Sequence, residues 1–294
     1  MGVREDKSPI GIVGGSGLYD IADIEIDSRV KLETPYGDPS DEYVIGFLLG
    51  VKVIFLNRHG PGHKITAPGV NFRANVYGFK ALGAQVLIGV SAVGSMREEL
   101  APMDIVIPDQ MIDLTKCRES SFFIDTPAIH GGMADPFCND LGAALAECAG
   151  SVGANVTLGG TYLCIEGPAF STRAESKLYR TWGVDVIGMT AATEAKLCRE
   201  AEVCYSSISL VTDYDCWKEG AEDVTLDMII GYVQKNAEMA GQIIRQAITR
   251  VPDLASCACR NALAPAIATS HEQIPDVTRR RLRVLLEKYL PVKD

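Results

Sequence analysis

The sequence has no hydrophobic run long enough to cross a membrane. Its apolar stretches all fall short of the roughly 20 consecutive residues that a membrane-spanning helix needs. The first residues, MGVREDKSPIG, lack the apolar segment of a signal peptide, and Asp6 stands where a myristoylation motif needs Ser or Thr. We therefore expect a cytoplasmic protein with no membrane partner.

Positive charge is also scarce. The chain has 28 Lys and Arg residues against 38 Asp and Glu residues, which gives a formal net charge of -10. Nucleic acids are bound through an excess of basic residues, so the composition argues against a nucleic-acid partner. A small anion can still be held locally in an acidic protein, and small molecules remain the expected ligands.

Histidine is rare, and no two cysteines stand in a C-x-x-C pair. With four histidines and nine cysteines so spaced, the sequence predicts no zinc site and no other metal site. Cys257 and Cys259 form a C-x-C pair, which is compatible with a strained disulfide or with two reduced thiols. The reducing cytoplasm favours reduced thiols.

Apolar segments of two kinds alternate along the chain, and they predict an α/β fold. Apolar residues make up 47% of the sequence and charged residues 22%, which is typical of a globular protein. The predicted strands are 10–13, 43–48, 51–56, 86–91, 104–107, 156–165, 184–189 and 204–212. The predicted helices are 70–82, 141–149, 174–181, 191–200 and 226–250. Alternating strands and helices predict a mixed, mostly parallel β-sheet covered by helices.

The chain shows no internal repeat, low-complexity segment or linker, so we expect a single domain over 1–294. The segment 252–294 is a C-terminal extension that ends in a helix with a basic start at Arg279 and apolar residues that include Leu285. This helix can pack on its own domain or contact a neighbouring subunit.

Several predicted strands end on residues that suit an anion. Ser16 lies in a glycine-rich turn, Arg58 and His59 follow a second strand, Ser91 ends a third, and Thr190 a fourth. Hydroxyls, backbone amides and a guanidinium at the carboxyl ends of strands can bind a phosphate. Each element also has a simpler interpretation: a tight turn, a surface Arg-His pair, or a local backbone contact. The glycine-rich turn could also open a dinucleotide site, although it lacks the third glycine of that motif.

Two carboxylates follow the last predicted strand. Asp213 and Asp215 are separated by Tyr214, so the two-residue period of a strand would turn both to one face. Charges this close raise at least one pKa. In the alternative interpretation, one acid caps a turn and the other pairs with Lys218. Together with the anion-binding strand ends, the carboxyl pair indicates an enzyme that uses phosphate.

Motifs throughout residues 8–250 resemble those of the trimeric purine nucleoside phosphorylase family. They are GGSGLYD at 14–20, ETPYGDPSD at 33–41, NRHGPGH at 57–63, VNFRAN at 70–75, GSMREEL at 94–100, IEGPAFSTRAES at 165–176, WGVDVIGMT at 182–190 and TDYDCWKE at 212–219. The resemblance implies a nucleoside phosphorylase-like fold and a homotrimer or a dimer of trimers. It implies phosphorolysis of 5'-methylthioadenosine to adenine and 5-methylthioribose 1-phosphate in methionine and purine salvage, with inorganic phosphate as co-substrate and no cofactor.

The resemblance also assigns roles to individual residues. The implied phosphate-binding residues are Ser16, Arg58, His59, Ser91, Ala92 and Thr190. The implied nucleoside-binding residues are Phe170, Met189, Asp213, Asp215, Leu226 and Ile229, with His130 and Leu285 supplied by a neighbouring subunit. Some relatives carry a C-x-C disulfide near the C-terminus, which would apply here to Cys257 and Cys259.

Asp213 and Asp215 are the expected catalytic residues. A protonated Asp213 would donate to purine N7 as the base departs, and Asp215 would hold it in that form. The carboxyl pair suits a 6-amino group, whereas a 6-oxopurine would place an acceptor against acceptors. The alternatives are an inosine, guanosine or methylthioinosine phosphorylase on the same scaffold and, more remotely, a dinucleotide-dependent enzyme or a non-catalytic nucleoside-binding protein.

Overall fold

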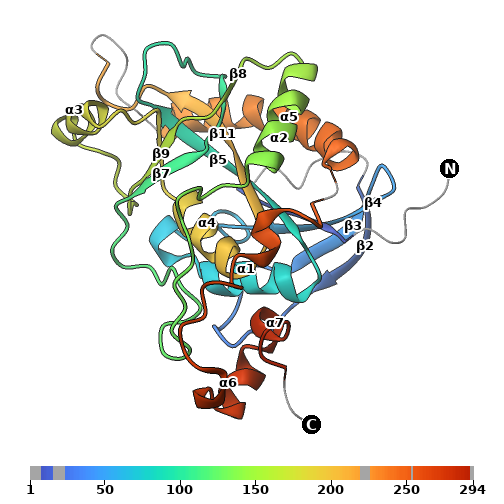
Figure 1. Ribbon diagram of the computed structural model, residues 1–294. Helices are drawn as coiled ribbons and strands as arrows, with labels where there is room; N and C mark the ends of the chain where they lie inside the picture. Colours follow the sequence, from blue (N-terminus) through green and yellow to red (C-terminus); the bar gives the residue numbers. More distant parts are fainter. Residues whose placement is uncertain (1–7, 16–23, 219–225, 253, 292–294) are drawn as a thin grey trace.

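A computed structural model of the chain describes residues 8–15, 24–218, 226–252 and 254–291, apart from the side chains of 226–231, 233 and 234. Figure 1 shows a central twisted sheet with helices on both faces and a C-terminal segment that projects from the main body. None of the helices in the described ranges is long and apolar enough to cross a membrane.

The sheet contains eleven of the described strands and is mixed. Its main path runs β2-β3-β4-β1-β5-β10-β9-β7, and β11 pairs with β5 and β6, which in turn pairs with β8. The strands are β1 (Ile10–Gly14), β2 (Glu25–Val30), β3 (Tyr43–Leu48), β4 (Val51–Asn57), β5 (Val86–Ser95), β6 (Ile105–Ile107), β7 (Gln110–Asp113), β8 (Val156–Leu158), β9 (Thr161–Cys164), β10 (Val186–Gly188) and β11 (Cys204–Asp213).

Four parallel strands at the centre of the sheet place their carboxyl ends at one edge. β1 pairs in parallel with β4 and β5, and β11 pairs in parallel with β5. β1 and β11 are buried along nearly their whole length, because helices cover both faces of the sheet. As a result, the residues that follow β1, β4, β5 and β11 converge, although they are far apart in the sequence.

Helices cover the two faces of the sheet. The helices are α1 (Phe72–Ala81), α2 (Asn139–Ser151), α3 (Arg173–Thr181), α4 (Ala191–Glu200), α5 (Leu226–Arg250), α6 (Asp276–Arg281) and α7 (Arg283–Leu286), with the short 3-10 turns η2 (Ala67–Gly69), η3 (Ala258–Asn261) and η4 (His271–Gln273). Side chains of α1, α4 and α7 share one hydrophobic cluster. Those of α2 and α5 share a second cluster. The sheet is therefore the middle of three layers.

Most predicted elements are confirmed, and some differ. The predicted strand 43–48 and the helices 191–200 and 226–250 have the predicted bounds. The predicted strand 156–165 is divided into β8 and β9, because Gly159 and Gly160 adopt positive φ angles of 93° and 116°. Strands β2 and β7 were not predicted.

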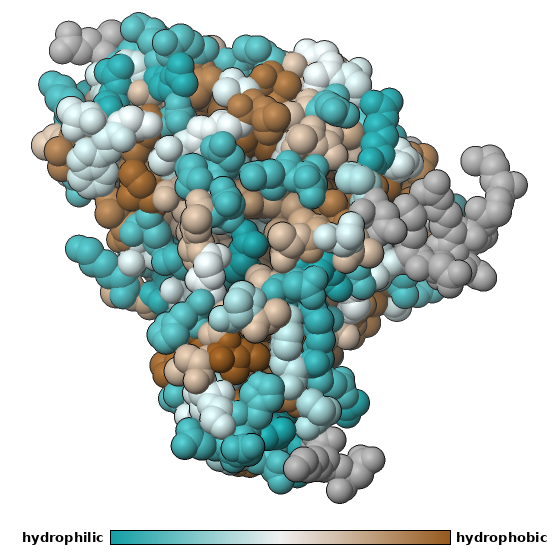
Figure 2. All heavy atoms as spheres, viewed as in Figure 1, coloured by the Kyte–Doolittle hydropathy of each residue, from teal (hydrophilic) through white to brown (hydrophobic). Residues whose placement is uncertain are grey.

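The C-terminal extension ends in two short helices, where the sequence predicted one. Leu282 lies between them, as the C-cap residue of α6 and the N-cap residue of α7, and its side chain is fully buried. α7 contacts α1 of the same chain. In the space-filling view of Figure 2, this segment forms the narrow lower part of the molecule.

Candidate active site

A cavity of about 790 Å³ opens at the edge of the sheet where the four central parallel strands end. The predicted site residues that line it are Arg58, His59, Ser91, Ala92, Phe170, Met189, Thr190, Asp213 and Asp215. Three further predictions are not tested: Ser16 lies outside the described residues, and so do the side chains of Leu226 and Ile229.

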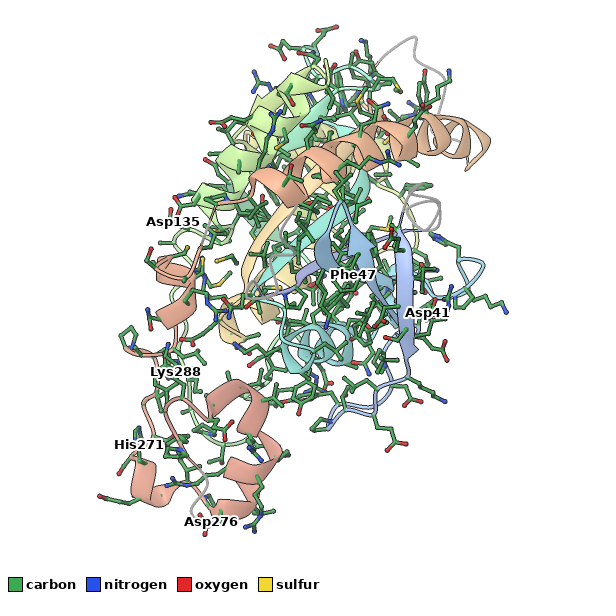
Figure 3. The ribbon with its side chains drawn as sticks, turned by 90° about the vertical axis from the view of Figure 1, so that its right-hand side faces the viewer. Asp41, Phe47, Asp135, His271, Asp276 and Lys288 are labelled. Carbon is green, nitrogen blue, oxygen red and sulfur yellow. The ribbon has the colours of Figure 1, made fainter. Side chains whose placement is uncertain are left out.

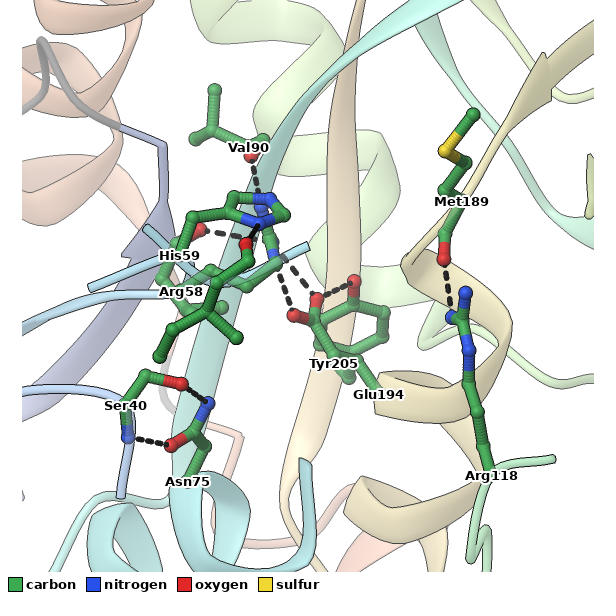
Figure 4. A network of polar contacts seen from close by, with 11 residues as sticks. Ser40, Arg58, His59, Asn75, Val90, Arg118, Met189, Glu194 and Tyr205 are labelled. Atoms are coloured by element: carbon green, nitrogen blue, oxygen red, sulfur yellow. Dashed lines mark hydrogen bonds and ion pairs between the residues drawn. The ribbon is translucent and has the colours of Figure 1, made fainter. Parts of the chain in front are cut away.

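Arg58 is buried beneath the cavity and bound on several sides. Its Nε and Nη2 donate to the Glu194 carboxylate at 2.5 and 3.0 Å, its Nη1 donates to the Val90 carbonyl at 2.8 Å, and Nη2 also donates to the Val13 carbonyl at 3.3 Å (Figure 4). Tyr205 donates to the same carboxylate at 2.7 Å. A guanidinium has five N–H groups, so one on Nη1 has no acceptor among the described residues and can serve a ligand.

This network corrects one expectation about the phosphate site. Arg58 was expected to supply a fixed positive charge, but Glu194 neutralises that charge at close range. Both side chains are nearly inaccessible to water, at 2% and 3% exposed, so their attraction is poorly screened. An anion in the cavity must therefore depend largely on neutral donors.

Two buried hydroxyls are available for that purpose. Ser91 Oγ and Thr190 Oγ1 are inaccessible to water, and neither forms a hydrogen bond among the described residues. Thr190 is the N-cap residue of α4, yet its side chain makes no capping hydrogen bond. The positive end of the helix dipole lies at the same place. An unused hydroxyl at a helix N-terminus is a favourable arrangement for a phosphate oxygen.

His59 is held in its neutral form at the cavity wall. Its Nδ1 lies 2.9 Å from the Ile65 carbonyl oxygen, which can only accept, so Nδ1 carries the proton. Its ring stacks on that of His63 with centroids 4.4 Å apart. Burial, followed by the nearby Arg58 charge, lowers the pKa of His59 to about 4. Nε2 then has a free lone pair that can accept a hydrogen bond from a protonated phosphate oxygen.

The two carboxylates meet in the cavity through a turn and not through strand alternation. β11 ends at Asp213 after a register shift, and Asp215 lies beyond the strand with a φ angle of 50°. The Asp215 N–H donates to Asp213 Oδ1 at 2.7 Å and closes the turn. Gly94 makes room for it, since a Cβ there would lie 3.0 Å from Asp213 Oδ1. Both carboxylates line the same cavity, as the sequence predicted. They do so because of this turn, and not because of the two-residue period of a strand.

Lys218 does not pair with either acid. Its Nζ lies 4.0 Å from Glu98 Oε1 and 3.6 Å from the centroid of the Tyr214 ring. The part of the alternative interpretation that pairs one acid with Lys218 is therefore wrong, whereas the part in which one acid caps a turn is confirmed by the hydrogen bond from the Asp215 N–H to Asp213 Oδ1.

Both acids favour protonation. Burial raises the pKa of Asp213, and hydrogen bonds from Thr212 and from the Asp215 N–H offset part of the rise. Burial also raises the pKa of Asp215; the Ser176 hydroxyl lowers it, and the Asp213 charge raises it further. Two carboxyls with raised pKa values in one cavity are a common feature of acid–base sites.

Thr212 can accommodate a neutral Asp213. Its hydroxyl oxygen lies 2.7 Å from Asp213 Oδ2 and 3.2 Å from the Val93 carbonyl oxygen. The hydroxyl has one proton for these two acceptors. When Asp213 is protonated it can donate to Thr212, and Thr212 can donate to Val93, so that no acceptor in this group is left without a proton.

Met189 and Phe170 line the remaining wall and the rim. The Met189 carbonyl accepts from Nη1 of Arg118 (Figure 4). Arg118 Nε donates to Glu166 at 2.9 Å. Arg118 thus ties the strand end at Met189 to the segment that leads to Phe170. The Phe170 side chain is 51% exposed at the cavity rim.

Sequence reasoning missed Glu194, Thr212 and Arg118 as parts of the site. Glu194 lies in the predicted helix 191–200, and nothing in its spacing from Arg58 signals the ion pair. His63 also lines the cavity. It belongs to the glycine-containing segment 57–63, so a signal for it was present.

The two residues expected to contact a neighbouring subunit, His130 and Leu285, differ in their exposure. His130 is exposed and lies away from the cavity of its own chain. Leu285 is 3% exposed and belongs to the hydrophobic cluster formed by α1, α4 and α7. The Leu285 side chain is thus used in the core of its own chain, and its contact with a neighbour's site stays a prediction.

All nine cysteines are free, including Cys257 and Cys259. The reduced thiols expected from the compartment are present, and the C-x-C disulfide implied by the family resemblance is not formed. Four of the cysteines nevertheless lie together, and none of these four lines the cavity. The absence of a C-x-x-C pair therefore does not exclude a metal site.

The chain is similar to known phosphorylases over nearly its whole length. A family profile described as the phosphorylase superfamily matches residues 9–249. The S-methyl-5'-thioadenosine phosphorylases of Geobacter sulfurreducens and Koribacter versatilis are 52% and 48% identical, over 96% of this chain and 99% and 97% of theirs.

Solved structures give the same result. A methylthioadenosine phosphorylase from an antarctic soil metagenomic library has a TM-score of 0.88 and 46% identity, covering 96% of this chain and 100% of that one. The enzyme of Schistosoma mansoni in complex with adenine has a TM-score of 0.84 and 33% identity, covering 89% and 99%. The chain therefore belongs to the phosphorylase superfamily and, within it, to the S-methyl-5'-thioadenosine phosphorylase family.

Proposed function

We propose that the chain catalyses the phosphorolysis of 5'-methylthioadenosine to adenine and 5-methylthioribose 1-phosphate, with inorganic phosphate as co-substrate. The relatives at 48–52% identity carry the name of this activity. The observation that carries the proposal is one cavity with unpaired hydroxyls at one wall and a carboxyl pair with raised pKa values at another. Such a cavity can hold an anion and protonate a departing base at the same time.

Phosphate is held mainly by neutral groups. Ser91, Thr190 and the free N–H of Arg58 donate to its oxygens, and His59 Nε2 accepts from a protonated oxygen. Ser16, which lies outside the described residues, and the amide of Ala92 are proposed to complete this set. Neutral donors in a water-poor cavity can stabilise an anion without a strong net charge, because they are already oriented.

The reaction exchanges one bond at the sugar carbon C1'. The bond from C1' to purine N9 breaks, its electron pair leaves with the base, and a phosphate oxygen forms the new bond to C1'. We propose that Asp213, whose pKa is raised by burial, carries a proton when the nucleoside is bound, transfers it to N7 and so neutralises the base. General-acid assistance of this kind contributes about 10²–10⁴ in rate. Asp215 is proposed to hold the Asp213 carboxyl group in place through its N–H, which donates to Asp213 Oδ1.

The carboxyl pair favours a 6-aminopurine. After the proton has moved to N7, Asp213 can accept a hydrogen bond from the 6-amino group. A 6-oxopurine places a carbonyl oxygen there, and the resulting mismatch can reject it by roughly 10⁴-fold. Leu226 and Ile229 are proposed to contact the methylthio group. A phosphorylase of inosine, guanosine or methylthioinosine is the second candidate. For such a base, the side chain at position 213 would have to donate a hydrogen bond to the 6-oxo group.

The test is release of free base from methylthioadenosine, adenosine and inosine, each with and without phosphate. We expect adenine from methylthioadenosine only when phosphate is present, together with the sugar 1-phosphate in equal amount. Base release without phosphate would indicate a hydrolase, and faster release from inosine would indicate the second candidate. Either result would contradict the proposal.

The enzyme is further proposed to act as a homotrimer or a dimer of trimers in the cytoplasm. Phe170 is an apolar side chain left half exposed at the cavity rim, which suits a site completed by another subunit. His130 is exposed and available for such a contact. Light scattering coupled to gel filtration should give the mass of three or six chains, and a monomer that is fully active would contradict this arrangement.

A further inference from the structure

Four cysteines from distant parts of the sequence converge at the start of β11, whereas the end of this strand lines the cavity. The Sγ atoms of Cys138, Cys204, Cys257 and Cys259 all lie within 4.8 Å of one another. In Figure 3, yellow sulfur atoms gather just below the label of Asp135. The nearest cysteines in sequence among the four are Cys257 and Cys259, and the other two are separated by 66 positions, so no short motif reveals the cluster.

Each cysteine is presented by a defined piece of backbone. Cys138 is the N-cap residue of α2, and its N–H donates to the Tyr205 carbonyl at 2.8 Å, next to Cys204 at the start of β11. Cys257 is the N-cap residue of η3, and its N–H donates to the Leu254 carbonyl at 3.1 Å. The positions of the four sulfur atoms therefore follow from the fold of the sheet and the helices.

The spacing of the sulfur atoms fits a tetrahedral metal ion. With a zinc–sulfur bond of about 2.3 Å, the sulfur atoms of a tetrahedral site lie roughly 3.8 Å apart. The Sγ atoms of Cys138 and Cys257 are 3.7 Å apart, and no pair in the cluster exceeds 4.8 Å. Small rotamer changes are enough to bring all four to the ideal distance.

The surroundings also suit a closed structural site. Cys138, Cys204 and Cys259 are buried and Cys257 is half-buried, so four protein ligands leave no open position for water. A zinc ion with four thiolates carries a net charge of about -2, which needs compensation in a buried place. Arg199 Nη1 lies 3.6 Å from Cys259 Sγ and supplies positive charge there.

We propose that Cys138, Cys204, Cys257 and Cys259 bind one Zn²⁺ ion that fastens the C-terminal extension to the central sheet. Binding displaces the four thiol protons into solvent and forms four zinc–sulfur bonds, with no change in the oxidation state of sulfur or metal. The ion joins α2, β11 and η3, and η3 precedes the segment that carries α6 and α7.

The site is separate from the proposed reaction. Cys204 begins β11 and Asp213 ends it, so the metal and the carboxyl pair are on the order of 30 Å apart along the strand. All four ligand positions are filled by protein, which leaves none for a substrate. The ion therefore stabilises the fold and does not take part in bond breaking.

Metal analysis of the intact protein, purified under reducing conditions without chelators, tests the proposal directly. We expect about one zinc per chain, and the Cys257→Ser/Cys259→Ser variant should hold less than about a tenth of that amount. Cys117 is exposed and outside the cluster, so Cys117→Ser is the matched control and should keep its zinc. Zinc retained by the double variant would overturn the proposal.

A second measurement needs only the unaltered chain, so it does not depend on whether a variant folds. The reduced, metal-free protein should take up one Co²⁺ and show the intense absorption of a tetrathiolate site, and added Zn²⁺ should remove that absorption. Zinc should also raise the midpoint of thermal unfolding of this protein. Failure to take up either metal, or disulfides among these four cysteines in protein kept under reducing conditions, would overturn the assignment.

Discussion

Glu194 accepts two hydrogen bonds from the guanidinium of Arg58, although 136 positions separate the two residues in the sequence. Arg58 follows β4, and Glu194 lies in the first turn of α4, where its N–H donates to the carbonyl of the N-cap residue Thr190 at 3.4 Å. The pair therefore fixes the cationic residue of the cavity and the helix N-terminus in one arrangement. Its effect on phosphate binding is mainly positional, since its two charges cancel.

The first prediction concerns stability. Glu194→Ala leaves the buried Arg58 without a counter-charge, and breaking a buried pair in this way costs roughly 3–5 kcal/mol. Glu287→Ala is the control, because Glu287 and Arg283 form a pair that is 54% and 63% exposed and should contribute less than about 1 kcal/mol. Urea unfolding of both variants measures the difference. Equal losses in the free energy of unfolding of the two variants would contradict a large contribution of the Arg58–Glu194 pair to stability.

The second prediction concerns phosphate affinity. Arg58→Ala removes one donor and leaves the negative charge of Glu194 near the phosphate site, so the KM for phosphate should rise roughly tenfold or more. The KM for methylthioadenosine should change little. In Arg58→Ala/Glu194→Ala the repulsive charge is gone, and part of the phosphate affinity should return. Initial rates at varied phosphate test this, and equal effects on both substrates would contradict the role of Arg58.

Sequence reasoning placed most of the cavity lining because strand ends are visible in the sequence. Arg58 follows β4, and parallel strands bring such ends together. Ser91 and Thr190 reach the cavity differently: β5 continues past Ser91 to Ser95, and Thr190 follows β10, which runs antiparallel to β5. The partner of Arg58 could not be found in this way. Glu194 lies on a helix, and only the packing of α4 against the sheet determines which strand end it reaches.

The elements that were missed have specific causes. β2 is an edge strand with the sequence EIDSRV, and it is largely exposed, so it lacks the apolar pattern of the central strands. The cysteine cluster was missed for another reason: it combines residues from α2, β11 and η3, which are far apart in the sequence. Spacing along the chain describes local motifs, whereas this cluster depends on tertiary structure.

The third prediction concerns substrate choice. Asp213→Asn keeps the oxygen that accepts the Asp215 N–H and replaces the other with an NH₂ group, which can donate to O6 or N7. The ratio of kcat/KM for inosine to that for methylthioadenosine should therefore rise. Asp140→Asn, an exposed change on α2, is the control and should leave the ratio unaltered. An unchanged ratio in the Asp213 variant would contradict its role at the base.

The fourth prediction concerns the pH dependence of stability. Burial raises the pKa of Glu200 from 4.5 to about 7, although its carboxylate accepts the Phe122 N–H at 2.7 Å. Between these two values the folded state binds more protons than the unfolded state, so stability falls as the pH rises. The loss is complete above pH 7 and amounts to roughly 3 kcal/mol at most.

Glu200→Gln removes the titration and keeps an oxygen for the Phe122 N–H. The variant and the unaltered protein should have similar free energies of unfolding near pH 4.5, and the variant should become the more stable of the two as the pH rises toward 8. Glu147→Gln, an exposed change on α2, should follow the unaltered protein throughout. Urea unfolding at a series of pH values gives these differences. Parallel curves for all three proteins would mean that Glu200 titrates as it does in water, and that its burial does not disfavour the charged form.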